Sequence, residues 1–303
     1  MITTNLLLGE IDYLIQSDIE IPYLNENQFE SFKNSSRNST VKIEFKEIEK
    51  FDEKVSAAKA NLDLVKRSIL FKQSWIENPF FYSSQFWQVF EKSSKNPDFI
   101  KMELAWNRIL FFDFLSNHFI YFYPSGSRNM FSGFEYQARV RNLAGFGLPG
   151  LQGMLIHSAG INMNNKGALF LAPDNGGKTT TVSLFKNDCI LSDDQIVLRF
   201  RDNKACIYGT PFGSISSANK GIELKGIFLI KKAQSFRLTK IKASEVVKFI
   251  WDEHFFTICF LPREIKKRLF CSLADAVKNI PAFHLHLAKG HIDWKEIENN
   301  LAE

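Results

Sequence analysis

The segment "ALFLAPDNGGKTTTVSLF", residues 168–185, constrains the fold most, because an apolar run stops at a tight turn and an amphipathic segment follows. It predicts a buried strand, a turn over 172–177, and a helix that begins near Lys178. Further short apolar runs separated by turns occur on both sides of this segment: "GMLIHSAGI", "CILSDDQIVLRF", "ACIYGTPF" and "GIELKGIFLI". Strands that alternate with helical segments in this way indicate an α/β or mixed-sheet domain.

The turn before Lys178 has the residue types that a phosphate-binding loop requires. Small residues let backbone N–H groups converge on phosphate oxygens at the start of a helix. Lys178 can supply a positive charge to the β and γ phosphates, and the Thr179 hydroxyl can bind Mg²⁺. The pattern G-x-x-x-x-G-K-[ST] would place its first glycine at Ala172, while Asn175 tolerates left-handed backbone geometry. The alternative is a plain connection between a strand and a helix that contains a lysine.

Two acidic residues, Asp193 and Asp194, end a short apolar run after the predicted helix. Adjacent carboxylates repel one another unless a cation lies between them, and a bound magnesium would supply that cation. A solvated turn is the alternative for an isolated pair. A third candidate is His157, which stands in the apolar run before the loop strand and could equally be a core residue with a satisfied hydrogen bond.

The order of His157, the Gly-Gly-Lys-Thr loop, the acid pair and "YGTPF" (208–212) resembles the P-loop kinases of the HPr kinase/phosphorylase type and their diverged relatives. A more distant similarity is to ATP-dependent phosphoenolpyruvate carboxykinase. The resemblance covers roughly residues 150–226. It implies an α/β fold with a P-loop-containing mixed sheet of the HPr kinase/PEP carboxykinase type, with an additional α+β region at the N-terminus.

The resemblance also implies roles for individual residues. Asp193 would act as the base toward the acceptor hydroxyl, His157 would tune the proton affinity of that base, and Lys178 would bind the phosphates. Thr179 and Asp194 would lie on the metal side. The nucleotide-binding residues would be Asp174, Asn175, Gly176, Gly177, Lys178, Thr179 and Thr180. The implied cofactors are ATP, with GTP as an alternative, and Mg²⁺.

The function expected from these residues is a Mg-ATP-dependent kinase that transfers the γ-phosphate to a hydroxyl, preferably of a serine or threonine in a protein or peptide. A small-molecule acceptor, a non-catalytic nucleotide-binding switch and a protein without a nucleotide site are the alternatives. The net charge of +5 arises from basic residues that are mixed with acidic ones, so no nucleic-acid partner is expected. Assembly into a homo-oligomer stays open.

The chain is expected to divide into an N-terminal α+β region, 1–104, for partner or substrate recognition, and a kinase domain, 105–303. Within the first region the sequence predicts a loop over 25–40, a strand over 42–51 and a helix over 52–75. Around the boundary it predicts a helix over 101–117 and a strand over 119–124. The start of the sequence lacks the features of a secretory signal, and the aromatic clusters are too interrupted to span a bilayer. A cytoplasmic location without a membrane partner is expected.

Two pairs of residues with alternate spacing are weaker candidates. Arg139 and Arg141 would face one way on a strand and could bind an anion, although solvated arginines are the alternative. His284 and His286 have the spacing of metal ligands, but no third ligand is evident.

Overall fold

The structure is a computed structural model that describes residues 2–17, 21, 24, 27–35, 39–48, 99–104, 108–113, 117–124, 133–186, 189–201, 204–215, 218–254, 258, 261–288 and 292–302. The chain divides into two compact units. One comprises Met1–Leu6, Asp12–Leu24 and Ser35–Leu143, and the other comprises Leu7–Ile11, Asn25–Asn34 and Ala144–Glu303. The division into a recognition region and a kinase domain concerns function and stays a prediction.

A six-stranded sheet is formed by the N-terminal part of the chain, with strand order β1-β2-β3-β6-β5-β4. Its strands are β1 (Ile2–Leu8), β2 (Ile11–Ser17), β3 (Val41–Ile48), β4 (Phe99–Leu104), β5 (Arg108–Asp113) and β6 (His118–Pro124). Strand β3 runs parallel to β2 and β6, whereas β5 runs antiparallel to β4 and β6. This sheet is therefore mixed.

The strands expected over 42–51 and 119–124 are confirmed by β3 and β6. The helix expected over 101–117 is wrong, because β4 and β5 pair as antiparallel neighbours there. The run "RILFFD" is rich in aromatic and branched residues, which favour strands when a sheet offers partners on both sides. The loop expected over 25–40 contains the 3-10 helix η2 (Asn27–Phe32), where the side chains of Phe29 and Phe32 are buried. The helix expected over 52–75 lies outside the described residues.

The second sheet has eight strands, with the order β11-β10-β7-β8-β12-β14-β13, and β9 also pairs with β7. The strands are β7 (Gly153–Met163), β8 (Lys166–Leu171), β9 (Ile190–Ser192), β10 (Gln195–Arg201), β11 (Lys204–Tyr208), β12 (Gly221–Lys232), β13 (Arg237–Lys240) and β14 (Ala282–Leu287). Strands β8, β12 and β14 are parallel, and the remaining pairings are antiparallel. The large mixed sheet predicted from the sequence is thus confirmed.

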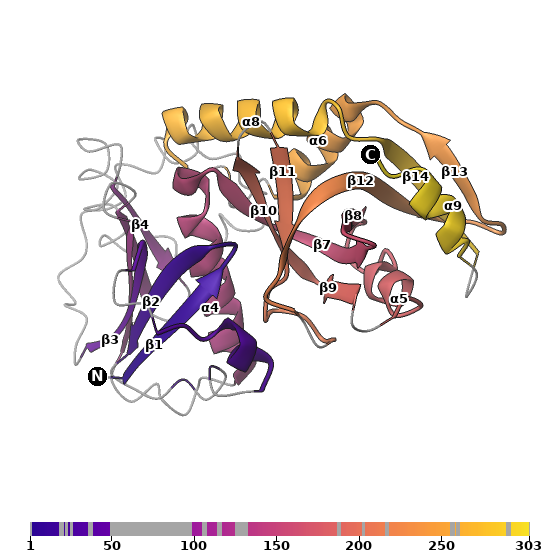
Figure 1. Ribbon diagram of the computed structural model, residues 1–303. Coiled ribbons are helices and arrows are strands. Elements are labelled where there is room, and N and C mark those ends of the chain that lie inside the picture. The colour runs from indigo at the N-terminus through magenta and orange to yellow at the C-terminus, as the bar shows by residue number, and fades with distance from the viewer. Residues whose placement is uncertain are drawn as a thin grey trace. The chain divides into compact units, whose positions relative to one another are not determined.

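Helices cover both faces of the second sheet (Figure 1). The helices of this unit are η6 (Pro149–Leu151), α5 (Lys178–Val182), α6 (Ala243–Glu253), α8 (Arg263–Val277) and α9 (Trp294–Asn299). Helix α4 (Gly133–Gly147) precedes them in the chain and belongs mostly to the first unit. A buried cluster joins Phe170 and Phe228 of the sheet to Val182 of α5 and Ile297 of α9. Helix α6 lies against the opposite face, where its Glu245 reaches His284 of β14. Burial of such apolar surface is the main source of stability for the fold.

The parallel strands decide where a site can form. Their carboxyl ends meet at one edge of the sheet, where ligands bind in open α/β proteins. The connection from β8 to α5, residues 172–177, begins at this edge. No helix within the described part of the chain is long and apolar enough to cross a membrane.

Candidate functional site

The 172–177 loop has the backbone geometry of a tight, inward-turning connection. Asn175 and Gly177 adopt positive φ angles of 58° and 98°, and the Gly176 N–H donates to the Pro173 carbonyl at 2.9 Å. A Cβ atom at Gly176 would lie 2.5 Å from the Ala172 Cβ. Ala172 takes the place of the first glycine in the phosphate-loop pattern. Its methyl group fits there because Gly176 has no side chain.

Lys178 is folded underneath this loop. Lys178 is 5% exposed, and its Nζ donates to the carbonyls of Ala172 at 2.8 Å and Pro173 at 3.1 Å. These bonds use two of the three N–H donors of a lysine ammonium. Burial lowers the pKa of Lys178, and the negative charges of Asp174, Asp194 and Glu253 oppose that shift. The ammonium is thus held at the loop by backbone carbonyls and surrounding carboxylates.

The helix after the loop is shorter than the sequence pattern predicts. Helix α5 ends at Val182, and the Thr181 hydroxyl donates to the Gly177 carbonyl at 2.7 Å. Thr179 and Thr180 are exposed, and the Thr179 hydroxyl lies 3.5 Å from the Asp193 backbone carbonyl. That contact brings the acid pair next to the loop, which the kinase interpretation requires.

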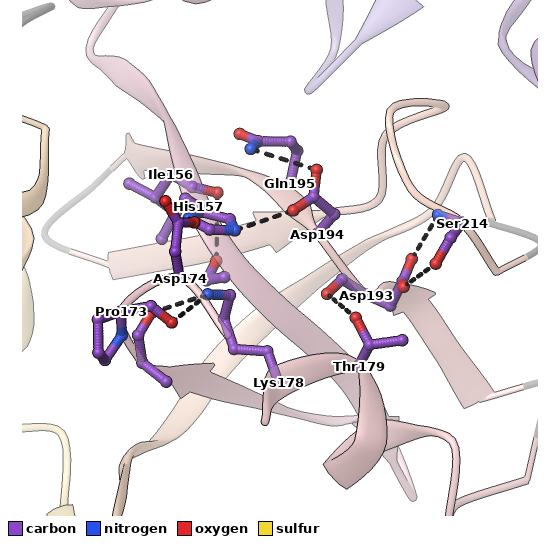
Figure 2. Close-up of polar contacts among 12 residues, drawn as sticks. Ile156, His157, Pro173, Asp174, Lys178, Thr179, Asp193, Asp194, Gln195 and Ser214 are labelled. Carbon is purple, nitrogen blue, oxygen red and sulfur yellow. Dashed lines mark hydrogen bonds and ion pairs between the residues drawn. The ribbon is translucent and has the colours of Figure 1, made fainter. Parts of the chain in front are cut away.

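The acid pair lies between β9, which ends at Ser192, and β10, which begins at Gln195, and the two acidic side chains point to different partners (Figure 2). Asp193 is 1% exposed. Its carboxylate accepts from the Ser214 N–H at 2.9 Å, the Ser214 hydroxyl at 2.5 Å and the Ile215 N–H at 3.1 Å. Asp193 thus fixes the 213–215 turn, and only its backbone carbonyl approaches Thr179.

Asp194, in contrast, faces His157. Its Oδ1 lies 2.9 Å from His157 Nε2, and the other ring nitrogen, Nδ1, lies 3.2 Å from Asp174 Oδ1 (Figure 2). An imidazole with a proton on both nitrogens can donate to both carboxylates. His157 is placed opposite Gln195 by the antiparallel pairing of β7 and β10. This histidine therefore connects the 172–177 loop with the turn at Asp194.

His254 is a site residue that the sequence analysis missed. It is the C-cap of α6, and its Nε2 accepts a hydrogen bond from the His157 backbone N–H at 3.2 Å. Burial foremost, with the positive charges of His157 and Lys178, lowers the pKa of His254 to about 4. A neutral His254 with its proton on Nδ1 thus leaves Nε2 free to accept from the His157 backbone N–H and so helps to hold His157 in place. Its segment, "KFIWDEHFF", contains no motif that could have identified it.

The weaker candidates lie elsewhere. Arg139 and Arg141 belong to α4, so the expected strand at these residues is wrong, and residues two apart on a helix do not share a face. His284 contacts Glu245 at 2.7 Å and Lys231 at 3.0 Å. Among the described residues, no group of three or more His, Cys, Asp or Glu side chains is arranged to hold a metal ion. Within the 208–212 segment, Thr210 is buried and its hydroxyl donates to the Gln195 carbonyl at 2.7 Å, so Thr210 attaches this segment to β10.

The loop nevertheless has oxygen donors that suit Mg²⁺. The hydroxyl of Thr179 is at the exposed start of α5, and the Asp194 carboxylate, a third exposed, could serve either as a second donor to such an ion or as a base, but not as both. Hydroxyl and carboxylate oxygens are hard donors, and Mg²⁺ in nucleotide sites is held by few protein groups together with phosphate oxygens and water. The residues present therefore fit such an ion.

Comparisons with known proteins give limited similarity. No protein-family model matches this chain, and no curated protein matches it. Among the solved structures that match, an Hpr(Ser) kinase/phosphatase from Coxiella burnetii is similar at 18% sequence identity with a TM-score of 0.21, over 29% of this chain and 78% of that chain.

Proposed function

We propose that this protein is a Mg²⁺-dependent kinase that transfers the γ-phosphate of ATP to a hydroxyl group. The observation that carries the proposal is the chain of contacts from Asp174 through His157 to Asp194. It joins the loop that would hold the phosphates to a carboxylate that can receive a proton. Phosphoryl transfer depends mainly on alignment and on stabilisation of charge, so loop, cation and carboxylate must be adjacent.

The loop and Lys178 would bind the phosphates. Left-handed geometry at Asn175 and Gly177 bends the loop backbone, and turns with such geometry can direct N–H groups at an anion. Lys178 has a further N–H donor beside its two bonds to loop carbonyls, and it can direct this donor to a phosphate oxygen. Mg²⁺ held through Thr179 would neutralise negative charge on the transferred group.

The geometry favours Asp194 as the base. In the proposed step, the acceptor oxygen bonds to the γ-phosphorus while the bond from that phosphorus to the β–γ bridging oxygen breaks, which releases ADP. The proton of the acceptor hydroxyl passes to the Asp194 carboxylate, which His157 orients. The sequence assigned this role to Asp193 and a metal role to Asp194. We propose the change because three hydrogen bonds already occupy the buried Asp193 carboxylate.

The acceptor is proposed to be a serine or threonine of a protein or peptide. The site is open enough for a chain to reach it, since the Asp174 side chain is 85% exposed and that of Asp194 is 33% exposed. Recognition of this acceptor is assigned to the N-terminal region, 1–104. Use of GTP, a small-molecule acceptor and homo-oligomer formation remain secondary proposals.

Thermal unfolding with ATP, GTP and pyrophosphate, each with and without Mg²⁺, tests the site before the acceptor is known. A nucleotide at about one hundred times its Kd should stabilise the folded protein by about 2.7 kcal/mol. We expect stabilisation of the wild-type protein and little of Lys178→Ala.

Lys186→Ala is the matched control, because this exposed lysine follows the same short helix and is not among the residues proposed to bind the nucleotide. Transfer is then measured with labelled ATP and a library of serine- and threonine-containing peptides. Absence of stabilisation by every nucleotide would overturn the proposal. Stabilisation without transfer to any acceptor would instead indicate a nucleotide-dependent switch.

A further inference from the structure

Helix α5 contributes little positive potential to the proposed phosphate site. It contains five residues, which is little more than one turn, and a helix dipole is the sum of aligned peptide groups. Lys178 adds one positive charge, but Asp174 and Asp194 lie close enough to influence it. A triphosphate carries several negative charges, so a further cation from another element would add to the charge that Lys178 and the proposed Mg²⁺ supply.

The parallel pairing of β8 and β12 brings such a cation to the loop. Leu229 of β12 is opposite Leu171, the last residue of β8, so β12 continues beyond β8 to Lys232. Phe228 and Ile230 belong to the buried cluster that contains Val182 of α5. Since side chains alternate along a strand, Lys232 continues this row on the face that α5 covers.

The side chain of Lys232 already contacts the loop. Its Nζ donates to the Asn175 carbonyl at 3.1 Å, and the residue is exposed. Asn175 is the residue with left-handed geometry immediately before the two glycines. A lysine ammonium has three donors, so Lys232 can bind the loop and an anion in the loop together.

We propose that Lys232 is a second phosphate-binding cation of this site, which holds the loop through Asn175 and contacts the polyphosphate of the nucleotide. This inference rests on the proposed function. It concerns a strand-end lysine outside the phosphate-loop pattern, so the sequence motif does not include it. Because Lys232 would contact the phosphates and not the base, its contribution should be the same for ATP and for inorganic tripolyphosphate.

The neighbouring lysine provides a matched control. Lys231 lies on the other face of β12, where its Nζ is 3.0 Å from His284 Nε2. Both lysines are exposed and carry the same charge, so they differ mainly in the face of the sheet from which they project.

The experiment measures Kd for MgATP and for tripolyphosphate by calorimetry at two salt concentrations, with wild-type protein, Lys232→Gln, Lys232→Arg and Lys231→Gln. Glutamine can still donate a hydrogen bond to the Asn175 carbonyl, so it separates the charge from the contact. We expect Lys232→Gln to weaken both ligands by the same factor, about tenfold, since hydrogen bonds to charged groups are the stronger ones. The affinity of the Lys232→Gln variant for both ligands should also depend less on the salt concentration than that of the wild type. Lys232→Arg should largely restore binding, and Lys231→Gln should bind as the wild type does.

The outcomes distinguish the two proposals. The role of Lys232 alone would be overturned if the wild-type protein binds the ligands and Lys232→Gln binds them with the same Kd. Equal losses of affinity in Lys232→Gln and Lys231→Gln would overturn it as well. If the wild-type protein binds neither ligand, the proposed function itself fails and the role of Lys232 fails with it. Unfolding temperatures without ligand show whether each variant is folded, and the arginine variant provides a test should the glutamine variant be unstable.

Discussion

At the scale of single residues, Asp194 has the most direct proposed part in the chemistry. We expect Asp194→Asn to retain nucleotide binding but to lower the transfer rate by roughly 100-fold, since a positioned base contributes at least that much. An asparagine keeps the shape of the side chain but cannot accept the proton. Steady-state transfer and nucleotide Kd are measured together. An Asp194→Asn variant with the wild-type transfer rate would remove this residue from the mechanism.

Asp193 has a different expected effect, because its carboxylate is part of the folded structure. Replacement by alanine leaves the N–H groups of Ser214 and Ile215 without their acceptor. Hydrogen bonds to a buried charged group are worth the most, so Asp193→Ala should lower the free energy of unfolding by about 3 kcal/mol.

Urea unfolding of Asp193→Ala and Asp194→Ala provides the comparison, with the smaller loss expected for Asp194, whose side chain is partly exposed. Equal losses in the two variants would show that the 213–215 turn does not depend on Asp193.

At the scale of elements, the 172–177 loop depends on its two glycines for different reasons. A Cβ at Gly177 would meet nothing within 4 Å, but its φ angle of 98° is unfavourable for a side chain. A Cβ at Gly176 would instead overlap with Ala172 and the Pro173 carbonyl. We expect Gly177→Ala to cost about 1–2 kcal/mol of folding stability through backbone strain.

Gly176→Ala should cost more and should change the loop itself. The double variant Ala172→Gly/Gly176→Ala removes one of the two overlapping groups, so it should recover part of the loss. Chemical denaturation of the three variants tests this ranking. A Gly176→Ala variant as stable as the wild type would contradict the close packing of this loop.

Much of the second sheet could be predicted from the sequence, because the strands there are short apolar runs bounded by clear turns. The loop and the proximity of Lys178 to the acid pair followed from the same pattern. The opposite orientations of Asp193 and Asp194 could not be predicted, since they depend on the 213–215 turn, which is distant in sequence. Lys232 and His254 were missed because strand pairing and the end of α6 bring them to the site. The helix expected over 101–117 failed because tertiary pairing overrides helical periodicity.

At the scale of the whole molecule, stability should depend on pH through His254. Its pKa in the folded protein is lowered from 6.5 to about 4 by burial first, and then by His157 and Lys178. The unfolded chain therefore binds more protons than the folded protein between these pH values. The stabilisation from a neutral His254 is complete above about pH 6.5 and is lost as the pH falls toward about 4. At about 1.4 kcal/mol per pH unit, the loss should approach about 3 kcal/mol.

A His254→Gln variant tests this dependence, because the glutamine side-chain oxygen can still accept from the His157 N–H but does not titrate. The free energy of unfolding, measured by denaturation at several pH values from 7.5 to about 4.5, should fall less steeply for this variant than for the wild type. His286→Gln is the comparison, since burial foremost also lowers the pKa of the partly exposed His286, and this variant should reduce the slope less than His254→Gln does. Parallel curves for His254→Gln and the wild type would show that this buried ring does not take up its proton on unfolding, and the support that it gives to His157 would then need another explanation.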